Sequence, residues 1–436
     1  MEKMEKTVYV EGYGCTANQN NLEIMCGLLE RNGFIIVKNP NIARIALINT
    51  CIVKGPTEQR MIYRIKELAR RFRHLIVSGC MVNVNPDKVK EIARKVNENV
   101  VVSLVGTNQI LNIVKAVKNN IENKQKDFLE RRKEIKLCVP KSYKNRVVGI
   151  TQISEGCINR CSFCVVKIAK GNLFSYPLKR IVENIKRDLA SKCKEIWITS
   201  QDNSSYGIDK GKQMLPELLK KITSIKGKFL VRVGMCNPAT VKPIVNELVE
   251  CYENEKIFKF LHLPVQSGSN KILSLMNRNY KVEDFKKIVR KFKKRFPEMT
   301  LATDIIVGFP SETEKDFKKT IELVKETKPV VVNISRFWSM PGTQASKMEQ
   351  LDEKTKKKRA KELMKLHLKI AEEENKKFIN KETEVLIDEK GFNNSWIGRE
   401  KNYRQVVVFS KEKLLGKFCN VRIEEAKSHY LIGKKK

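Results

Sequence analysis

A repeated strand–helix unit between residues 147 and 350 constrains the fold of this chain more than any other feature. The helical stretches, such as LKRIVENIKRDLASK, carry apolar residues at i, i+3 and i+4 spacing. Six apolar runs alternate with them: VVGITQIS, EIWITS, FLVRVGM, FKFLHLPV, TLATDIIVGF and VVVNISRFW. Such a repeat predicts parallel strands that curl into a barrel or most of one. We therefore expect a partial (β/α)6 barrel of the TIM type.

Polar residues follow each of these strands, and parallel barrels place their catalytic groups at the carboxyl ends of the strands. From position alone, we expect the following residues to contact a cofactor: Gln201, Asp202, Arg232, His262 and Gln266. For His262, in LHLPVQSGS, a buried core histidine is an equally good interpretation.

The loop after the first strand carries Cys157, Cys161 and Cys164 in a C-x3-C-x2-C spacing. A zinc site usually needs four ligands from two paired motifs, but no second pair follows, and the chain has only four histidines. A [4Fe–4S] cluster takes soft thiolates and can leave one iron without a protein ligand. The triplet therefore predicts a catalytic cluster with an open iron.

Residues 1–118 show a second strand–helix rhythm, in which three apolar runs each end at a cysteine. KTVYVEGYGC ends at Cys15, IALINTC at Cys51 and HLIVSGC at Cys80. The rhythm predicts an open parallel sheet covered on both faces, with its ligand site at the carboxyl ends of the strands. The three cysteines can therefore converge in space. The alternative, that they are small buried residues of the core, stays open on this evidence.

The rest of the chain suggests three further segments. Residues 119–146 are charged and polar and predict a linker, in which Cys138 is incidental. Residues 351–377 predict an amphipathic connecting helix, with His367 as a packing residue on its apolar stripe. Residues 378–436 contain short alternating strands and predict a small all-β barrel. Aromatic and basic residues interleave there, which favours RNA binding over packing alone: Trp396, Arg399, Lys401, Tyr403 and Arg404.

A formal net charge of +37 indicates a polyanionic partner. A membrane surface would compete with RNA for that role, but no lipidation motif, amphipathic anchor or long apolar run is present. We find no secretory signal at the start of the sequence. These features predict a cytoplasmic protein without membrane contact, in the reducing setting that iron–sulfur chemistry requires.

The loop GCINRCSFCVVKIAKG resembles the cluster loop of radical S-adenosylmethionine (SAM) enzymes, and the three-part layout resembles the methylthiotransferases among them. These have an N-terminal cysteine domain, a radical SAM barrel and a C-terminal RNA-binding barrel of the TRAM type. The N-terminal motifs match at Gly14, Cys15 and Asn18, then at 49–51 and 78–80. The resemblance implies two [4Fe–4S] clusters and SAM, with Cys15, Cys51 and Cys80 holding the second, sulfur-carrying cluster.

Further segments look like the archaeal and eukaryotic branch of the family: IWITSQDNSSYG, RVGMCNP, LHLPVQSGSNKIL and ATDIIVGFPSET. That branch inserts a 2-methylthio group at C2 of N6-threonylcarbamoyladenosine, at position 37 of the tRNA anticodon loop. The resemblance implies hydrogen abstraction by a 5′-deoxyadenosyl radical, a low-potential electron donor and a sulfur donor. Eukaryotic relatives can carry a hydrophobic C-terminal anchor, whereas this chain ends in GKKK, so we expect a bacterial or archaeal cytoplasmic enzyme.

Two alternatives remain within the family: methylthiolation of N6-isopentenyladenosine in tRNA, or of a ribosomal protein. A different class of function is an iron–sulfur electron carrier or an RNA-binding sensor without radical chemistry. Ferredoxin-type clusters take four cysteines each, while both triads here stop at three.

Overall fold

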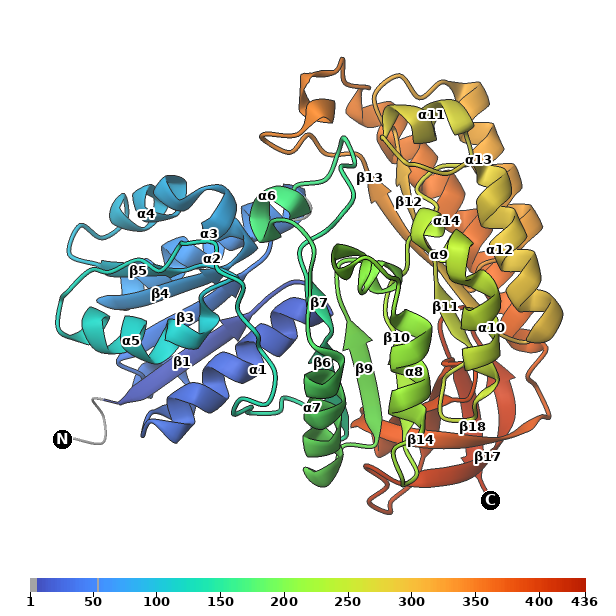
Figure 1. Ribbon diagram of the computed structural model, residues 1–436, viewed down its shortest axis with the longest axis horizontal. Coiled ribbons are helices and arrows are strands. Elements are labelled where there is room, and N and C mark those ends of the chain that lie inside the picture. The colour runs from blue at the N-terminus through green and yellow to red at the C-terminus, as the bar shows by residue number, and fades with distance from the viewer. Residues whose placement is uncertain (1–5, 53–54) are drawn as a thin grey trace. The chain divides into compact units, whose positions relative to one another are not determined.

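The computed structural model describes residues 6–52 and 55–436 (Figure 1) and divides into two compact units. The first comprises the described residues of Met1–Lys144 together with Ile150–Asn184 and Trp338–Ser346. The second comprises Asn145–Gly149, Ile185–Phe337 and Lys347–Lys436. The loop with Cys157, Cys161 and Cys164 thus belongs to the same unit as the N-terminal sheet, although the sequence suggested that it belongs with residues 147–350.

A five-stranded parallel sheet forms the centre of the first unit, with strand order β2-β1-β3-β4-β5. Its strands are β1 (Thr7–Gly12), β2 (Ile35–Val37), β3 (Ile45–Thr50), β4 (His74–Gly79) and β5 (Val101–Val105). Every residue of β3 and β4 is buried, as expected for central parallel strands that are covered on both faces. The predicted open parallel domain is confirmed.

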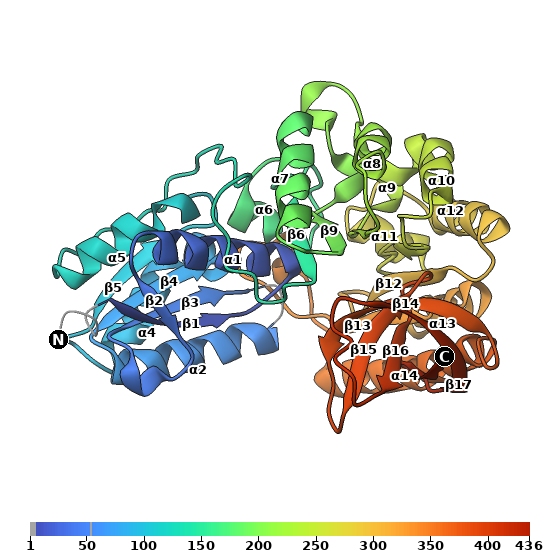
Figure 2. The same cartoon turned by 90° about the horizontal axis from the view of Figure 1, so that it is seen from below.

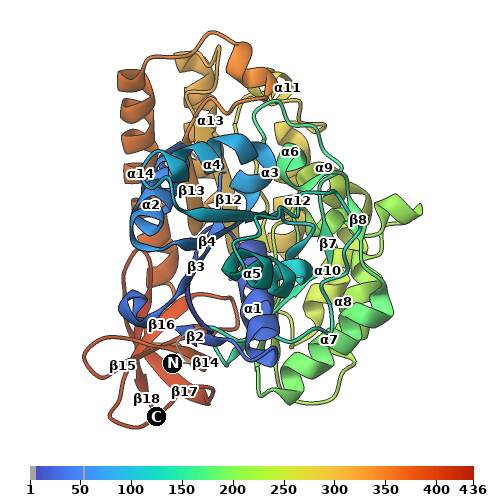
Figure 3. The same cartoon turned by 90° about the vertical axis from the view of Figure 1, so that its left-hand side faces the viewer.

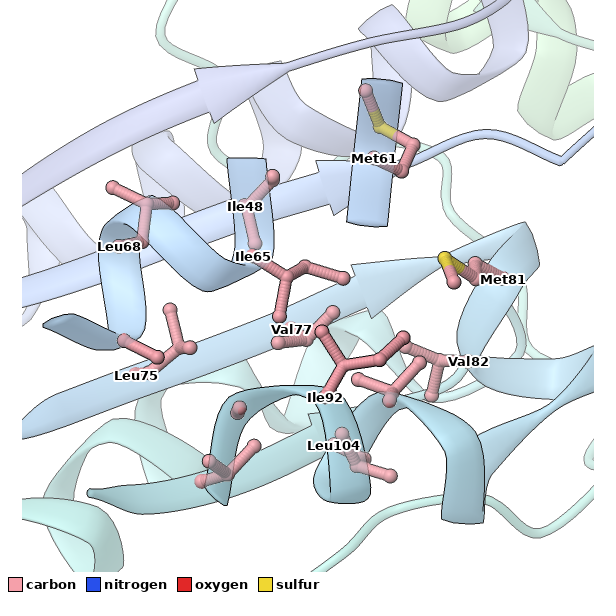
Figure 4. Packing of buried hydrophobic residues seen from close by; sticks show 14 of the residues in the cluster. Ile48, Met61, Ile65, Leu68, Leu75, Val77, Met81, Val82, Ile92 and Leu104 are labelled. Carbon is pink, nitrogen blue, oxygen red and sulfur yellow. The ribbon is translucent and has the colours of Figure 1, made fainter. Parts of the chain in front are cut away.

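Helices cover both faces of this sheet (Figure 2). On one face α1 and α5 pack Ile24, Met25 and Val117 against the strands. On the other face, residues such as Met61, Ile65 and Met81 form a second apolar cluster (Figure 4). The helices are α1 (Thr16–Arg31), α2 (Gly55–Arg71), α3 (Cys80–Val84), α4 (Pro86–Arg94) and α5 (Ile113–Ile121).

The segment predicted as a linker packs closely against this unit. Phe128 forms a parallel bridge with Val105 at the sheet edge, and Lys136 is completely buried. After it come β7 (Ser154–Glu155), α6 (Val166–Lys170) and β8 (Phe174–Ser175). Val165 and Ala169 join the apolar cluster around Met81, so the cysteine loop and α6 are built onto the sheet domain.

The second unit contains the strands of the predicted barrel, in the sheets β10-β9-β6 and β11-β12-β13. β9 and β10 pair in parallel, as do β11, β12 and β13, and Val231 forms a parallel bridge with Ile257, just before β11. The strands are β6 (Val148–Gln152, which begins in this unit), β9 (Glu195–Thr199), β10 (Leu230–Val233), β11 (Phe260–His262), β12 (Thr300–Val307) and β13 (Val331–Arg336). The helices between them are α7 (Leu178–Ala190), α8 (Leu215–Thr223), α9 (Pro238–Val241), α10 (Val245–Glu253), α11 (Asn270–Leu275), α12 (Val282–Arg295) and α13 (Glu314–Thr327). These strands confirm the predicted partial (β/α)6 architecture.

A long helix, α14 (Glu353–Lys376), leads into a closed antiparallel-rich barrel at the C-terminus (Figure 3). The barrel order is β14-β15-β16-β18-β17, which confirms the predicted all-β barrel. Its strands are β14 (Glu382–Lys390), β15 (Ser395–Glu400), β16 (Gln405–Phe409), β17 (Phe418–Ala426) and β18 (Leu431–Lys435). His367 is buried on α14, where Nε2 accepts a hydrogen bond from the Val332 amide at 3.0 Å, so it packs as predicted.

No helix among residues 6–52 and 55–436 is both long and apolar enough to span a membrane.

Candidate active site

The dispersed triad, Cys15, Cys51 and Cys80, lies at the carboxyl ends of three neighbouring strands. Cys51 directly follows β3, Cys80 begins α3 straight after β4, and Cys15 caps α1 beyond β1. The pKa of Cys80 is raised to about 12, mainly by burial; nearby Lys170 opposes the rise, and Cys15 and Cys51 add to it. The electrostatic contact among the thiols indicates that the three strand ends bring the cysteines together.

Two glycines allow the close approach of these strand ends. Gly14 (φ 105°) would place a Cβ 2.9 Å from the Cys51 Cβ, and Gly79 (φ 98°) would place one 2.3 Å from the Thr50 carbonyl oxygen. Both conformations and both contacts exclude a side chain. Asn18 ties the loops further, because its Nδ2 donates to the carbonyls of Tyr13 at 3.1 Å and Thr50 at 2.9 Å.

The local triad, Cys157, Cys161 and Cys164, lies in one loop between β7 and α6, and all three side chains are half-buried. The Cys157 amide donates to the Gly171 carbonyl at 3.2 Å, and Asn159 Nδ2 donates to Cys157 Sγ at 3.7 Å. Gly156 (φ 74°) would place a Cβ 2.0 Å from the Asn172 carbonyl oxygen. The loop is therefore folded tightly against the end of α6.

The donor chemistry of both triads fits a cluster better than a single ion. Across the described part of the chain, no three His, Cys, Asp or Glu side chains are placed to hold one metal ion. The thiolates of an iron–sulfur cube bind different irons and stand farther apart than the ligands of one ion. Beside the dispersed triad, Ser78 Oγ and Asn49 Oδ1 are buried without a hydrogen-bond partner among the described residues. Buried polar atoms without a hydrogen-bond partner are rare in protein cores, and they are compatible with a site that binds a further group.

A buried ion network in the first unit was missed by the sequence analysis. The Glu155 carboxylate pairs with Lys136 Nζ at 2.6 Å and with Lys170 Nζ at 3.2 Å. The available signal was a carboxylate directly after the apolar run VVGITQIS, two residues before Cys157. Lys136 came from a segment that we interpreted as a solvated linker, so its burial could not be predicted from charge.

In the second unit, Gln201 and Asp202 follow β9 at its carboxyl end, as predicted. Asp202 is buried and accepts hydrogen bonds from Ser204 Oγ at 2.7 Å and Thr240 Oγ1 at 2.8 Å. Burial raises its pKa despite these donors. Asp202 therefore fastens the β9 and β10 loops together, whereas the buried Gln201 Oε1 lacks a partner among the described residues.

His262 and Gln266 both contact Asp304 in the carboxyl half of β12. His262 Nε2 lies 3.0 Å from Asp304 Oδ1, which also accepts from Asn333 Nδ2 at 2.7 Å. Gln266 adopts φ 69°, and its amide donates to the Asp304 carbonyl at 2.8 Å. Asp304 and Asn333 were missed by the sequence analysis, although polar residues inside apolar strands were the signal that could have found them.

Arg232 lies among three aromatic rings. Its guanidinium is 5.2 to 5.4 Å from the ring centres of Trp197, Phe260 and Tyr403. Phe260 is the first residue of β11, and the Lys401 carbonyl accepts a hydrogen bond from the adjacent Lys259 amide. The C-terminal barrel therefore lies beside Arg232. Contact of Arg232 with a cofactor stays a prediction.

The predicted RNA-binding residues separate into buried and exposed groups. Trp396 packs in the core of the C-terminal barrel, and Arg404 is buried with Nε 3.0 Å from Asn375 Oδ1. Tyr403 packs against Phe258 and Phe260, with Arg399 stacked on its ring. These contacts give the four residues a packing role, although Arg399 and Tyr403 stay partly exposed. RNA contact by these residues stays a prediction. Lys401 is exposed.

Two exposed aromatic residues lie at the other end of the β15–β16 pair. Phe392 is 91% exposed and Phe409 is 59% exposed. Ser395 connects them, because it is paired with Phe409 and donates its amide to the Phe392 carbonyl. Lys390 and Lys411 are exposed beside them. This end combines rings and positive charge at the surface, as single-stranded RNA requires.

Three family models match the chain. The radical SAM superfamily matches residues 151–324, the uncharacterized protein family UPF0004 matches residues 7–102, and the TRAM domain matches residues 376–436.

Similar curated proteins carry one function name. The probable threonylcarbamoyladenosine tRNA methylthiotransferase of Pyrococcus horikoshii is 40% identical over 98% of each chain. The Homo sapiens threonylcarbamoyladenosine tRNA methylthiotransferase is 33% identical over 98% of this chain and 73% of its own length. Among solved structures, a radical SAM methyltransferase from Kitasatospora setae shares the fold, with a TM-score of 0.55 and 14% identity over 76% of this chain and 73% of that one.

Proposed function

Because this chain belongs to the threonylcarbamoyladenosine tRNA methylthiotransferase family, we propose that it adds a methylthio group to N6-threonylcarbamoyladenosine in tRNA. The carbon modified is C2 of the adenine, and the nucleotide is position 37 of the anticodon loop. The observation that carries the proposal is the presence of two cysteine triads in one compact unit, in a chain with near full-length identity to these enzymes.

Each triad would hold one [4Fe–4S] cluster. Cys157, Cys161 and Cys164 leave one iron open for SAM, and Cys15, Cys51 and Cys80 leave one open for the sulfur to be transferred. Cys157, Cys161 and Cys164 would hold a cluster that, when reduced, would supply the electron for SAM cleavage. Gly14, Gly79 and Gly156 keep the thiols of the two triads in place by permitting the tight turns.

For contacts to SAM, we retain Gln201, His262 and Gln266 at the carboxyl strand ends, with Asp304 and Asn333 orienting His262. Asp202 acts through the loops that it fastens. We also keep Arg232 as a candidate, from its position on β10.

The tRNA arm is a single-stranded loop whose bases unstack at low cost. Phe392 and Phe409 would stack on bases, while Lys390, Lys401 and Lys411 contact phosphates. An external low-potential electron donor and a sulfur donor complete the reaction, which we place in the cytoplasm.

The decisive experiment is nucleoside mass spectrometry of tRNA from a strain that lacks this gene. We expect the 2-methylthio form of threonylcarbamoyladenosine to disappear, its unmodified precursor to accumulate, and the wild-type gene to restore the product. Loss of the isopentenyladenosine derivative, or an unchanged tRNA profile, would overturn the proposal.

A further inference from the structure

Residues Trp338–Ser346, which follow β13 in the chain, belong to the first unit and begin with an exposed tryptophan. Trp338 is 43% exposed, whereas the two other tryptophans of the chain, Trp197 and Trp396, are half-buried and buried. One exposed apolar side chain needs no explanation by itself. What distinguishes Trp338 is its place beside both cysteine triads.

The segment after Trp338 is fastened to the surroundings of both triads. The Ala345 amide donates to the carbonyl of Ser162, inside the loop of the local triad, at 2.9 Å. Met340 is 2% exposed and packs in the apolar cluster that contains Cys80 of the dispersed triad. The exposed indole therefore begins a segment whose own side chains are anchored in the first unit.

The indole of Trp338 lies flat on Gly55, the first residue of α2. A Cβ at Gly55 would stand 2.1 Å from both Cδ2 and Cε2 of the indole. Because these atoms share the inner bond of the double ring, a point equally close to both lies over a face of the ring. Gly55 follows Cys51 by four residues, a length of chain that spans at most about 14 Å. One face of the indole is thus covered, close to the dispersed triad.

Exposed arginines accompany the loops of both triads. Arg60 of α2 is exposed, and its guanidinium lies 5.0 Å from the ring centre of Tyr13, two residues before Cys15. Arg160 is exposed within the loop of the local triad. Aromatic rings with positive charges around them are typical of proteins that bind single-stranded nucleic acid by base stacking and phosphate contact.

We propose that Trp338 is the stacking platform for the adenine that receives the methylthio group. This inference rests on the proposed function, since it takes tRNA as the substrate. A base on which an enzyme acts is commonly taken out of its stack and held against aromatic or apolar side chains. One face of the indole covers Gly55 and the residue is 43% exposed, so the opposite face offers the surface for that base.

Binding of synthetic anticodon stem-loop RNA to the full-length, anaerobically reconstituted protein tests this role. One RNA carries N6-threonylcarbamoyladenosine at position 37, a second lacks the base at that position, and a third lacks the neighbouring base instead. Trp338→Leu removes the ring and keeps an apolar side chain, and Trp338→Phe keeps a smaller ring. Tyr63→Ala is the matched control, because Tyr63 is 58% exposed on the same helix, about 12 Å farther along than Gly55.

We expect Trp338→Leu to weaken binding of the complete RNA about tenfold, as for the loss of one stacked base. Removing base 37 should weaken binding to the parent by a similar factor, and the two losses should not add. Trp338→Phe should keep most of the affinity, and Tyr63→Ala should match the parent. The complete RNA should quench the tryptophan fluorescence of the parent but not that of Trp338→Phe, and the RNA without base 37 should quench neither.

An equal loss of affinity for the complete RNA and for the RNA without base 37 in Trp338→Leu would make Trp338 a packing residue and overturn the inference. Coupling of Trp338 to the neighbouring base instead of base 37 would overturn it as well. If Trp338→Leu fails to fold, the difference in fluorescence quenching between the parent and Trp338→Phe decides.

The two proposals fail in different ways. If the parent protein does not bind the complete RNA, the proposed function loses its substrate and the inference falls with it. If the parent binds that RNA and forms the methylthio product, but its affinity does not depend on the indole, only the inference falls.

Discussion

Cys157, Cys161 and Cys164 lie within one eight-residue loop, whereas Cys15, Cys51 and Cys80 come from the ends of three strands. The local triad is half-buried throughout, while Cys51 and Cys80 of the dispersed triad are buried and Cys15 is exposed. Bringing distant residues together costs chain entropy that short loops avoid. The dispersed triad therefore depends on three strand ends of the parallel sheet. The local triad depends on a single loop, which itself packs on that sheet.

The largest effect should come from removing one ligand of either triad. Cys161→Ala should lower 5′-deoxyadenosine formation to background, because the open iron for SAM is lost with the local cluster. Cys80→Ala should retain that cleavage and abolish the methylthio product, because only the sulfur-carrying site is lost. Each variant should keep about half of the iron, as each triad would hold one of two like clusters. Activity assays with iron analysis measure all three quantities.

If Cys161→Ala and Cys80→Ala gave the same SAM cleavage, product formation and iron content, the two triads would not have the separate roles proposed for them. Loss of all iron from a folded Cys161→Ala protein would mean that the dispersed triad holds no cluster by itself.

A smaller effect should follow from backbone strain at the carboxyl end of β4. Gly79→Ala forces a side chain into a left-handed conformation against the Thr50 carbonyl, and should destabilise the first unit by about 1–3 kcal/mol. The dispersed cluster should lose iron before the local one does. Denaturant unfolding combined with cluster spectroscopy checks both outcomes.

Gly33→Ala is the matched control, because Gly33 has φ 83° with open space around its Cα. It carries the conformational cost without the clash, so its iron content should equal that of the parent. Equal iron loss in both variants would show that strain alone, rather than the approach of β3 to β4, governs the site.

The third effect concerns the affinity of the protein for its tRNA substrate. Phe392→Ala should weaken tRNA binding by about 1–3 kcal/mol, the range measured for one base stacked on an aromatic ring. SAM cleavage without tRNA should not change. Filter binding at fixed salt measures the first quantity, with Leu415→Ala, an exposed aliphatic residue of the same barrel, as control. An unaltered affinity would remove this end of the barrel from the RNA interface.

The smallest effect is a pH dependence outside both triads. Burial lowers the pKa of His367 to about 4, below the usual 6.5, so the neutral imidazole is the form that folding favours. Its contribution to stability should be complete above pH 6.5 and lost as the pH falls toward 4. The loss should be about 1–3 kcal/mol, because protonated Nε2 no longer accepts from Val332.

Unfolding midpoints of the parent and His367→Gln between pH 7 and pH 4 test this point. The variant should lack the slope, since glutamine does not titrate there. A slope that persists in His367→Gln would assign the pH dependence to other groups.

Periodicity and spacing predicted the parallel sheet, the six-stranded repeat and the closing barrel, because each signal is local in the chain. The ligand roles of the six cysteines stay predictions. The packing contacts of Trp396 and Arg404 were not predicted, because interleaved rings and charges look the same on either face of a strand. The aromatic partners of Arg232 were not predicted either, because the strand pattern does not show where a long side chain reaches. Lys136 was missed because its partner Glu155 lies in a different predicted segment. An ion pair between residues of different segments is seen only in the folded structure.

The arrangement of β1, β3 and β4 has a consequence for how the protein matures. Parallel neighbours cannot pair until the helices between them are in place, and such long-range pairing is slow. Cys15, Cys51 and Cys80 offer no common site until the sheet is complete, and the local loop packs on that sheet through Val165 and Ala169. We therefore expect a protein caught before the sheet is complete to lack the metal of the dispersed triad.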